Sequence, residues 1–450
     1  MKLIKIMFLI SLFMMLSCSS NKLMTVKHQS NRITFDMDLE NGSMKVTADF
    51  VKSDVMGDSF LLNRDFVVHK IVCDGKEVHL DDEPEKLTIT AWGDFDVYQY
   101  NLPPYTNTLH IEYSGVLTGE TGLAYAKEQI SPEFTILRWE TFCYPIFAKI
   151  ETLTVDLMNL VDYEVTVYVP NGYTAVTSLD KGMMKETSNR QSFTASGKLE
   201  MALLAVAISK FQILELESAD YFLLKSTDKD LVIELADYIF SYADDYLSKH
   251  FGQVDAKNRL RVAEIPDRFG SFAVLNGNIF LAESFGFKTK RDMFQLIHEY
   301  IHTKWNVSIT LIEDREVQRS RFFDEAFTRY FEYRVNASYF GEKEADFYIN
   351  KVFKHTYGID LSQLPSIKDW GKYELGNLSY SLGALCLYKL SELIGIENFD
   401  RITTSFLKEY REKSVNFELF CKWYEDESGN PDVKEFFRKW IYTDEYKNEL

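Results

Sequence analysis

The sequence lacks any excess of positive charge, since 50 Lys and Arg stand against 68 Asp and Glu, for a formal net charge of −18. Such a chain repels polyanions, and no local Lys/Arg cluster overcomes the repulsion, which argues against a nucleic-acid partner. The chain also has no low-complexity tract and no internal repeat. Its 46 % apolar content leaves little room for long disordered stretches, so a folded globular protein is expected.

Cysteine is scarce, with five in 450 residues. The spacing matches neither a disulfide framework nor a Cys-x-x-Cys metal site, and the four cysteines beyond residue 20 are therefore expected to be small buried apolar residues. These four are Cys73, Cys143, Cys386 and Cys421.

Long apolar runs are also absent, because the run from Ile6 to Leu16 is too short to span a bilayer. It follows a positively charged start, as in an export signal. The segment ends in Leu16-Ser17-Cys18, which resembles the lipobox of bacterial lipoproteins. We therefore expect residues 1–17 to be a lipoprotein signal peptide and Cys18 to carry a lipid that anchors an exported protein to a bacterial membrane, periplasmic or at the surface. A plain secretory signal with an incidental cysteine is the alternative.

Two domains are expected, because 450 residues exceed what one hydrophobic core usually serves. From Arg32 to Glu215 the apolar residues recur with period two, and turn sequences such as Asn41-Gly42 interrupt them. This pattern predicts an N-terminal antiparallel β-sandwich over residues 30–216.

After residue 217 the apolar period becomes helical. Thr227 and Asp230 predict a capping box at the start of a first helix, and two short apolar stretches predict strands at Leu260 to Ile265 and Ile279 to Ala282. Residues 217–450 are therefore expected to form an α+β domain that is mostly helical.

The predicted helix that begins after Thr289 carries a motif of metal-ligating type, His298-Glu299-Tyr300-Ile301-His302. Residues four apart lie one turn apart on the same helix face, so two imidazoles can reach a single ion. Glu299 is about 100° away around the helix axis, beside the ion without ligating it. The alternative is a chance motif, which usually lacks a helical context and a third ligand.

A catalytic zinc needs three protein ligands and an open position, and two His with one Glu is an established set. Glu325 lies 23 positions after His302, in a second predicted helix and among apolar neighbours, which favours a buried carboxylate over a surface one. Such a zinc, one per chain, would activate water and polarise a peptide carbonyl, with Glu299 as general base and acid.

These features together resemble the alanyl aminopeptidase and leukotriene hydrolase family of gluzincin zinc metallopeptidases. The segment Asp324-Glu325-Ala326-Phe327-Thr328-Arg329-Tyr330-Phe331-Glu332 is similar to the family's Asn-Glu-Gly-Phe-Ala-x-Tyr-x-Glu element. The segment Tyr380-Ser381-Leu382-Gly383-Ala384 resembles its Tyr-x-Lys-Gly-Ala element, and the resemblance implies that Tyr380 stabilises the oxyanion. It also implies a thermolysin-like catalytic domain after the β-sandwich, a peptide or protein substrate, and the absence of the family's C-terminal helical domain.

Three departures bear on the activity. Val274 stands where the family has the Glu that holds the substrate's amino terminus. Between His302 and Glu325 lie 22 residues, four more than the family usually has. Leu382 replaces the Lys of the Tyr-x-Lys-Gly-Ala element. The sequence around Trp305 is also similar to the related glycyl aminopeptidases. We expect an aminopeptidase-like zinc peptidase. The alternatives are an endo- or oligopeptidase that does not recognise a free amino terminus, and a catalytically weak envelope binding module that retains zinc.

Overall fold

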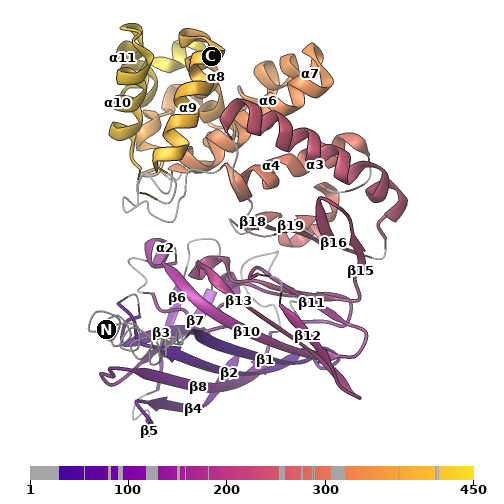
Figure 1. Ribbon diagram of the computed structural model, residues 1–450. Coiled ribbons are helices and arrows are strands. Elements are labelled where there is room, and N and C mark those ends of the chain that lie inside the picture. Colours follow the sequence, from indigo (N-terminus) through magenta and orange to yellow (C-terminus); the bar gives the residue numbers. More distant parts are fainter. Residues whose placement is uncertain are drawn as a thin grey trace, which may run out of the picture. The chain divides into compact units, whose positions relative to one another are not determined.

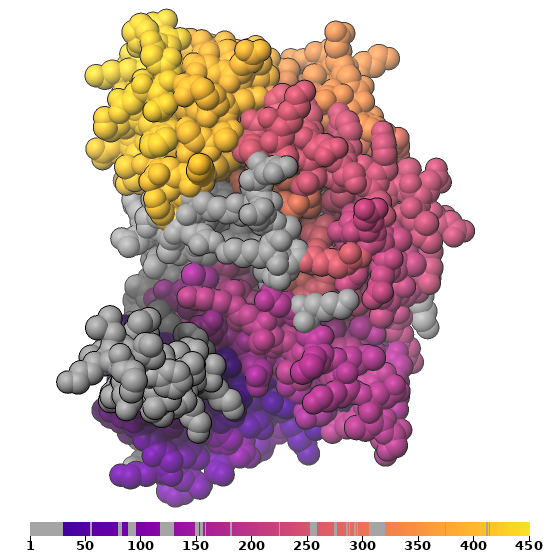
Figure 2. All heavy atoms as spheres, in the orientation of Figure 1, coloured from indigo at the N-terminus to yellow at the C-terminus, as the bar shows by residue number. Residues whose placement is uncertain are grey.

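The computed structural model describes residues 30–450 except 55, 80–82, 90–94, 118–129, 149–152, 158, 181, 225, 253–258, 275–276, 286, 288, 306–319, 374, 411–412 and 414. The expected signal peptide and Cys18 lie outside these residues. Residues 31–450 form one compact unit. Within it the strand-rich half is drawn indigo to magenta and the helical half red to yellow (Figures 1 and 2).

The strand-rich half contains one large sheet and two smaller ones among the described residues. The large sheet has the order β12-β13-β10-β1-β2-β8-β4-β5, and the smaller sheets have the orders β3-β7-β6 and β11-β14-β9 (Figure 1). The strands are β1 (Asn31–Asp38), β2 (Ser43–Val51), β3 (Ser59–Asn63), β4 (Phe66–Cys73), β5 (Lys76–Glu77), β6 (Glu85–Ile89), β7 (Phe95–Asn101), β8 (Thr108–Val116), β9 (Thr135–Leu137), β10 (Leu160–Pro170), β11 (Thr174–Thr177), β12 (Met183–Glu186), β13 (Arg190–Glu200) and β14 (Val206–Ser209).

The period-two pattern places alternate side chains in one shared core. Ile33 and Phe35 of β1 are fully buried, as are Phe60 of β3 and Ile208 of β14, and all four belong to the same hydrophobic cluster. The predicted sandwich is confirmed. One pairing departs from the prediction, because β1 runs parallel to β10 and antiparallel to β2. The four cysteines predicted to be buried are buried and unpaired.

The helical half begins with a mixed sheet of order β15-β16-β17-β19-β18 among the described residues. Its strands are β15 (Gln212–Glu215), β16 (Ala219–Leu223), β17 (Leu260–Ile265), β18 (Phe272–Val274) and β19 (Asn278–Ala282). Strands β16, β17 and β19 are parallel, and β18 is an antiparallel edge strand. The predicted domain division at residue 216 falls inside the hairpin that joins β15 to β16.

The helices of this half lie on the side of the sheet away from the strand-rich half, and most of them follow the sheet in the chain (Figure 1). They are α3 (Lys229–Phe251), α4 (Lys290–Lys304), α6 (Phe327–Phe340), α7 (Glu342–Phe347), α8 (Leu382–Ile394), α9 (Ile396–Tyr410), α10 (Phe417–Ser428) and α11 (Asp432–Phe437), and a short α2 (Leu153–Asp156) lies in the strand-rich half. The predicted capping box is wrong in detail. Asp228 is the N-cap of α3 and accepts from the backbone N–H groups of Asp230 and Leu231, because the Thr227 hydroxyl bonds to Glu264 instead.

Buried side chains of the mixed sheet donate hydrogen bonds to the strand-rich half. Arg261 of β17 donates to the carbonyl of Thr177, at 3.2 Å, and Asn278 of β19 donates to the carbonyl of Ser178, at 2.9 Å. All four residues are buried, so these bonds are shielded from water. Helix α4 packs against β18 and β19, and the sheet therefore supports the helix that carries the predicted zinc motif.

Candidate metal centre

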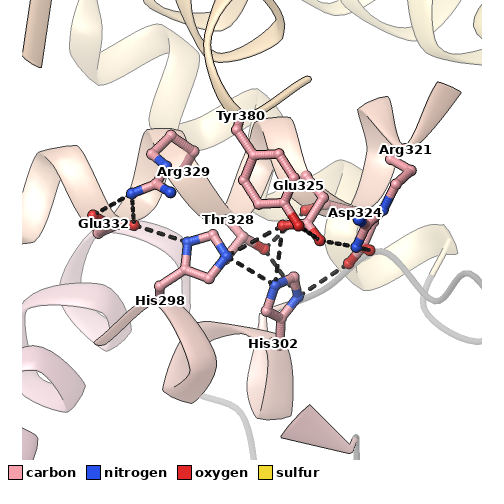
Figure 3. Close-up of polar contacts among 9 residues, drawn as sticks. All are labelled: His298, His302, Arg321, Asp324, Glu325, Thr328, Arg329, Glu332 and Tyr380. Atoms are coloured by element: carbon pink, nitrogen blue, oxygen red, sulfur yellow. Dashed lines mark hydrogen bonds and ion pairs between the residues drawn. The ribbon is translucent and has the colours of Figure 1, made fainter. Parts of the chain in front are cut away.

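Helix α4 brings the two motif histidines to one face. Leu296, Ile297 and Ile301 are fully buried, and this apolar face fixes the rotation of the helix. His298 and His302 are therefore directed at α6 and at the π-helix Phe322–Ala326 that precedes it (Figure 3).

The three predicted ligands converge on one point. Nε2 of His298 lies 3.2 Å from Nε2 of His302 and 3.2 Å from Oε2 of Glu325, and Nε2 of His302 lies 3.3 Å from the same oxygen. Zinc bonds of about 2.0–2.1 Å at tetrahedral angles separate neighbouring ligand atoms by about 3.3–3.4 Å. The three atoms thus match one face of a zinc tetrahedron.

Carboxylates behind each imidazole fix its orientation. Nδ1 of His298 lies 2.8 Å from Glu332, and Nδ1 of His302 lies 3.0 Å from Asp324. Because a carboxylate only accepts hydrogen bonds, each Nδ1 carries the proton and each Nε2 offers its lone pair to the centre. The donor set and its surroundings therefore fit zinc.

The charges around the centre are strongly coupled. Burial raises the pKa of the Glu325 carboxyl, but the charges of Arg321 and His302 outweigh this effect and hold the pKa well below its usual range. Burial raises the pKa of the Glu332 carboxyl, but Arg329 and His298 outweigh this effect and bring that pKa down to about 2. Both carboxylates are consequently charged at neutral pH, as ligation and support of a cation require.

The two predicted catalytic residues border the same centre. Glu299 follows His298 on α4 and is partly buried. Burial raises the pKa of its carboxyl above the usual value, and the opposing effect of the two histidines is smaller. Tyr380 ends the 3₁₀-helix Gly376–Tyr380, its hydroxyl donates to Oε1 of Glu325, and its ring stacks on His298 with 5.8 Å between centroids. The structure brings all five predicted residues together, and their catalytic roles stay predictions.

Several residues around the metal centre were not predicted from the sequence to have a role there. Glu332 supports His298 and is bonded twice by Arg329, at 2.7 Å to each oxygen, and once by the hydroxyl of Tyr348. Arg321 donates to Oε1 of Glu325, the carboxylate oxygen that does not contact the imidazole of His298. The signal available for Glu332 was its position seven residues after Glu325, two turns along one helix face.

The comparisons with known proteins agree with this fold. No family model matches the chain. An M1 zinc metallopeptidase from Deinococcus radiodurans superposes with a TM-score of 0.61 at 15 % identity, over 92 % of each chain. Native leukotriene A4 hydrolase from Saccharomyces cerevisiae superposes with a TM-score of 0.60 at 14 % identity, over 92 % of this chain and 67 % of that one.

One protein of known sequence is also similar to this chain. Tricorn protease-interacting factor F2 from Thermoplasma volcanium is 20 % identical over an alignment of 302 positions, which covers 62 % of this chain and 37 % of that protein's length. The chain therefore has the two-domain fold of the M1 zinc metallopeptidases, and the resemblance predicted from the sequence is confirmed at the level of the fold.

Proposed function

We propose that the chain is a zinc-dependent peptidase. The observation that carries the proposal is the triangle of His298 Nε2, His302 Nε2 and Glu325 Oε2, with sides of 3.2–3.3 Å and Glu299 beside it. Structural neighbours described as M1 zinc metallopeptidases support it, and one of them is a variant bound to a Tyr-Ser-Ala substrate.

The side chains have distinct roles in this proposal. Zinc, when bound, lowers the pKa of a coordinated water and polarises a substrate carbonyl. Glu299 accepts the proton of the attacking water and passes it to the departing amine. Tyr380 turns its hydroxyl from Glu325 toward the negative oxygen that develops on the attacked carbonyl, and stabilises it.

The proposed substrate preference is that of an aminopeptidase, and the resemblance of the 324–332 and 380–384 segments to the alanyl aminopeptidases supports it. Edge strand β18 ends at Val274, the position at which the family has its amine-binding Glu, and Val274 pairs with Asn278 of β19. Residues 275–276 lie outside the described residues. Because valine cannot neutralise an ammonium group, an endo- or oligopeptidase of the same fold is the second candidate.

Matched peptides with free and acetylated amino termini separate the two candidates. The zinc-loaded protein is expected to cleave the free peptide at least tenfold faster by kcat/KM, because an aminopeptidase binds the charged amine and acetylation removes that charge. Mass spectrometry of the products gives the bond cleaved. Equal rates, or cleavage inside the blocked peptide, would establish the endo- or oligopeptidase. Cleavage of neither peptide would contradict the peptidase and favour the zinc-retaining binding module.

We further propose that the protein is an exported lipoprotein held at a bacterial membrane by Cys18. The apolar run of residues 6–16 and the lipobox-like segment that follows it support this proposal. Among the described residues, no helix is both long and apolar enough to cross a bilayer. Cys18→Ala is expected to move the protein from the membrane pellet to the supernatant after cell lysis, and retention in the pellet would contradict a lipid anchor.

A further inference from the structure

Arg321 contacts both the carboxylate ligand and the predicted oxyanion donor. Its Nη2 donates to Oε1 of Glu325 and lies 3.6 Å from Asp324, and its guanidinium lies 5.3 Å from the centroid of the Tyr380 ring (Figure 3). The Tyr380 hydroxyl donates to the same Oε1. The two oxygens of Glu325 are therefore used differently, with Oε2 toward the imidazoles and Oε1 held by two donors.

The backbone of Arg321 is in a conformation that arginine seldom adopts. Its φ of 54° and ψ of 15° lie in the left-handed region, where the Cβ of an L-residue crowds the backbone. The π-helix Phe322–Ala326 begins at the next residue, and the Glu325 N–H donates to the Arg321 carbonyl at 2.8 Å. Strained residues and π-helical turns concentrate at functional sites.

We propose that Arg321 is a positioning residue for the metal centre, and the proposal rests on the zinc-peptidase function above. By occupying Oε1, Arg321 leaves Oε2 as the single oxygen of Glu325 that faces the ion. By lying against the Tyr380 ring, it sets the distance between the oxyanion donor and that ligand. One side chain thereby orients two members of the site.

The geometry of the guanidinium suits this role. Arginine presents several donors in a rigid planar fork and stacks on aromatic rings, whereas the lysine ammonium is a flexible point charge. Without Arg321, Oε1 keeps only the hydroxyl of Tyr380, which the proposed function turns toward the oxyanion, and Glu325 could then ligate through both oxygens and fill the position that a catalytic zinc keeps open. Residues that hold metal ligands in this way typically change metal affinity or activity about 10–100-fold when they are replaced.

Four variants test the role without depending on peptidase activity. Arg321→Met removes the charge and the fork, Arg321→Lys keeps only the charge, and Arg321→Gly removes the side chain while relieving the left-handed backbone. Arg438→Met is the matched control, because Arg438 is an ion-paired arginine whose two partners, Glu435 and Glu445, are also exposed. The measurements are zinc affinity by chelator competition, the visible spectrum of the Co²⁺-substituted protein, and the melting temperature of the metal-free protein.

Arg321→Met and Arg321→Gly are expected to bind zinc at least tenfold more weakly and to show a changed Co²⁺ spectrum, with Arg321→Lys intermediate and Arg438→Met unchanged. Both Arg321→Met and Arg321→Gly lose the ion pair with the buried Glu325, so their metal-free melting temperatures should fall, and by less in Arg321→Gly because glycine accepts positive φ without strain. Zinc affinities within twofold of wild type in both variants would overturn the proposal. So would a Co²⁺ spectrum unchanged from wild type in both variants, because a purely structural role would weaken binding without altering the coordination of the metal. A wild type that binds zinc but cleaves no peptide would overturn the function and leave the role of Arg321 tested by the same measurements.

Discussion

Glu299→Gln is expected to retain zinc at wild-type affinity and to lose about three orders of magnitude in kcat. Glutamine has nearly the same shape but cannot accept a proton, and general acid–base catalysis by one side chain contributes about 10²–10⁴-fold. Glu299 is adjacent to His298 on α4 and is not one of the three converging ligands. The measurements are zinc content by elemental analysis and kcat on the free-amine peptide.

Glu397→Gln is the matched control, because Glu397 is an exposed glutamate of α9 and the substitution changes the same atoms. Its kcat should equal that of the wild type. Wild-type turnover in Glu299→Gln would contradict the proposed mechanism. Loss of zinc in that variant would instead show that Glu299 supports the metal, so the two measurements together separate the roles.

The sequence predicted the parts of the site that depend on local periodicity. His298 and His302 are four residues apart on a helix, and this spacing alone requires them to share a face. The apolar neighbours of Glu325 predicted its burial, and its exposed fraction is 2 %. The strands at Leu260–Ile265 and Asn278–Ala282 were likewise predicted within one residue. Their apolar runs are short, and runs of this length are typical of buried strands rather than of helices.

Features set by long-range packing could not be predicted. The parallel pairing of β1 with β10 joins residues more than a hundred positions apart, and period two is the same for parallel and antiparallel neighbours. The left-handed backbone at Arg321 has no local signal, because glycine or asparagine is the usual residue in that region. The contact of Arg321 with Tyr380 likewise joins segments 59 positions apart.

His302→Ala is expected to weaken zinc binding by roughly a hundred- to a thousandfold and to abolish measurable turnover. Structural zinc sites with four ligands bind with about 10–16 kcal/mol, so one ligand accounts for roughly 3–4 kcal/mol. Among the described residues no other ligand group replaces it, because Asp324 lies on the far side of His302, at its Nδ1, and Glu325 already faces His298. Chelator competition measures the affinity, and peptide cleavage at saturating zinc measures the turnover.

The control for this variant is His69→Ala, because His69 is an exposed histidine of β4 in the strand-rich half. It should bind zinc and cleave peptide as the wild type does. His302→Ala should also differ from Glu299→Gln, since the former loses the metal and the latter keeps it. Zinc binding by His302→Ala within threefold of wild type would place the ion elsewhere in the chain. The convergence of His298, His302 and Glu325 would then have to be explained by the carboxylate–imidazole ion pairs alone, and the peptidase proposal would lose its foundation.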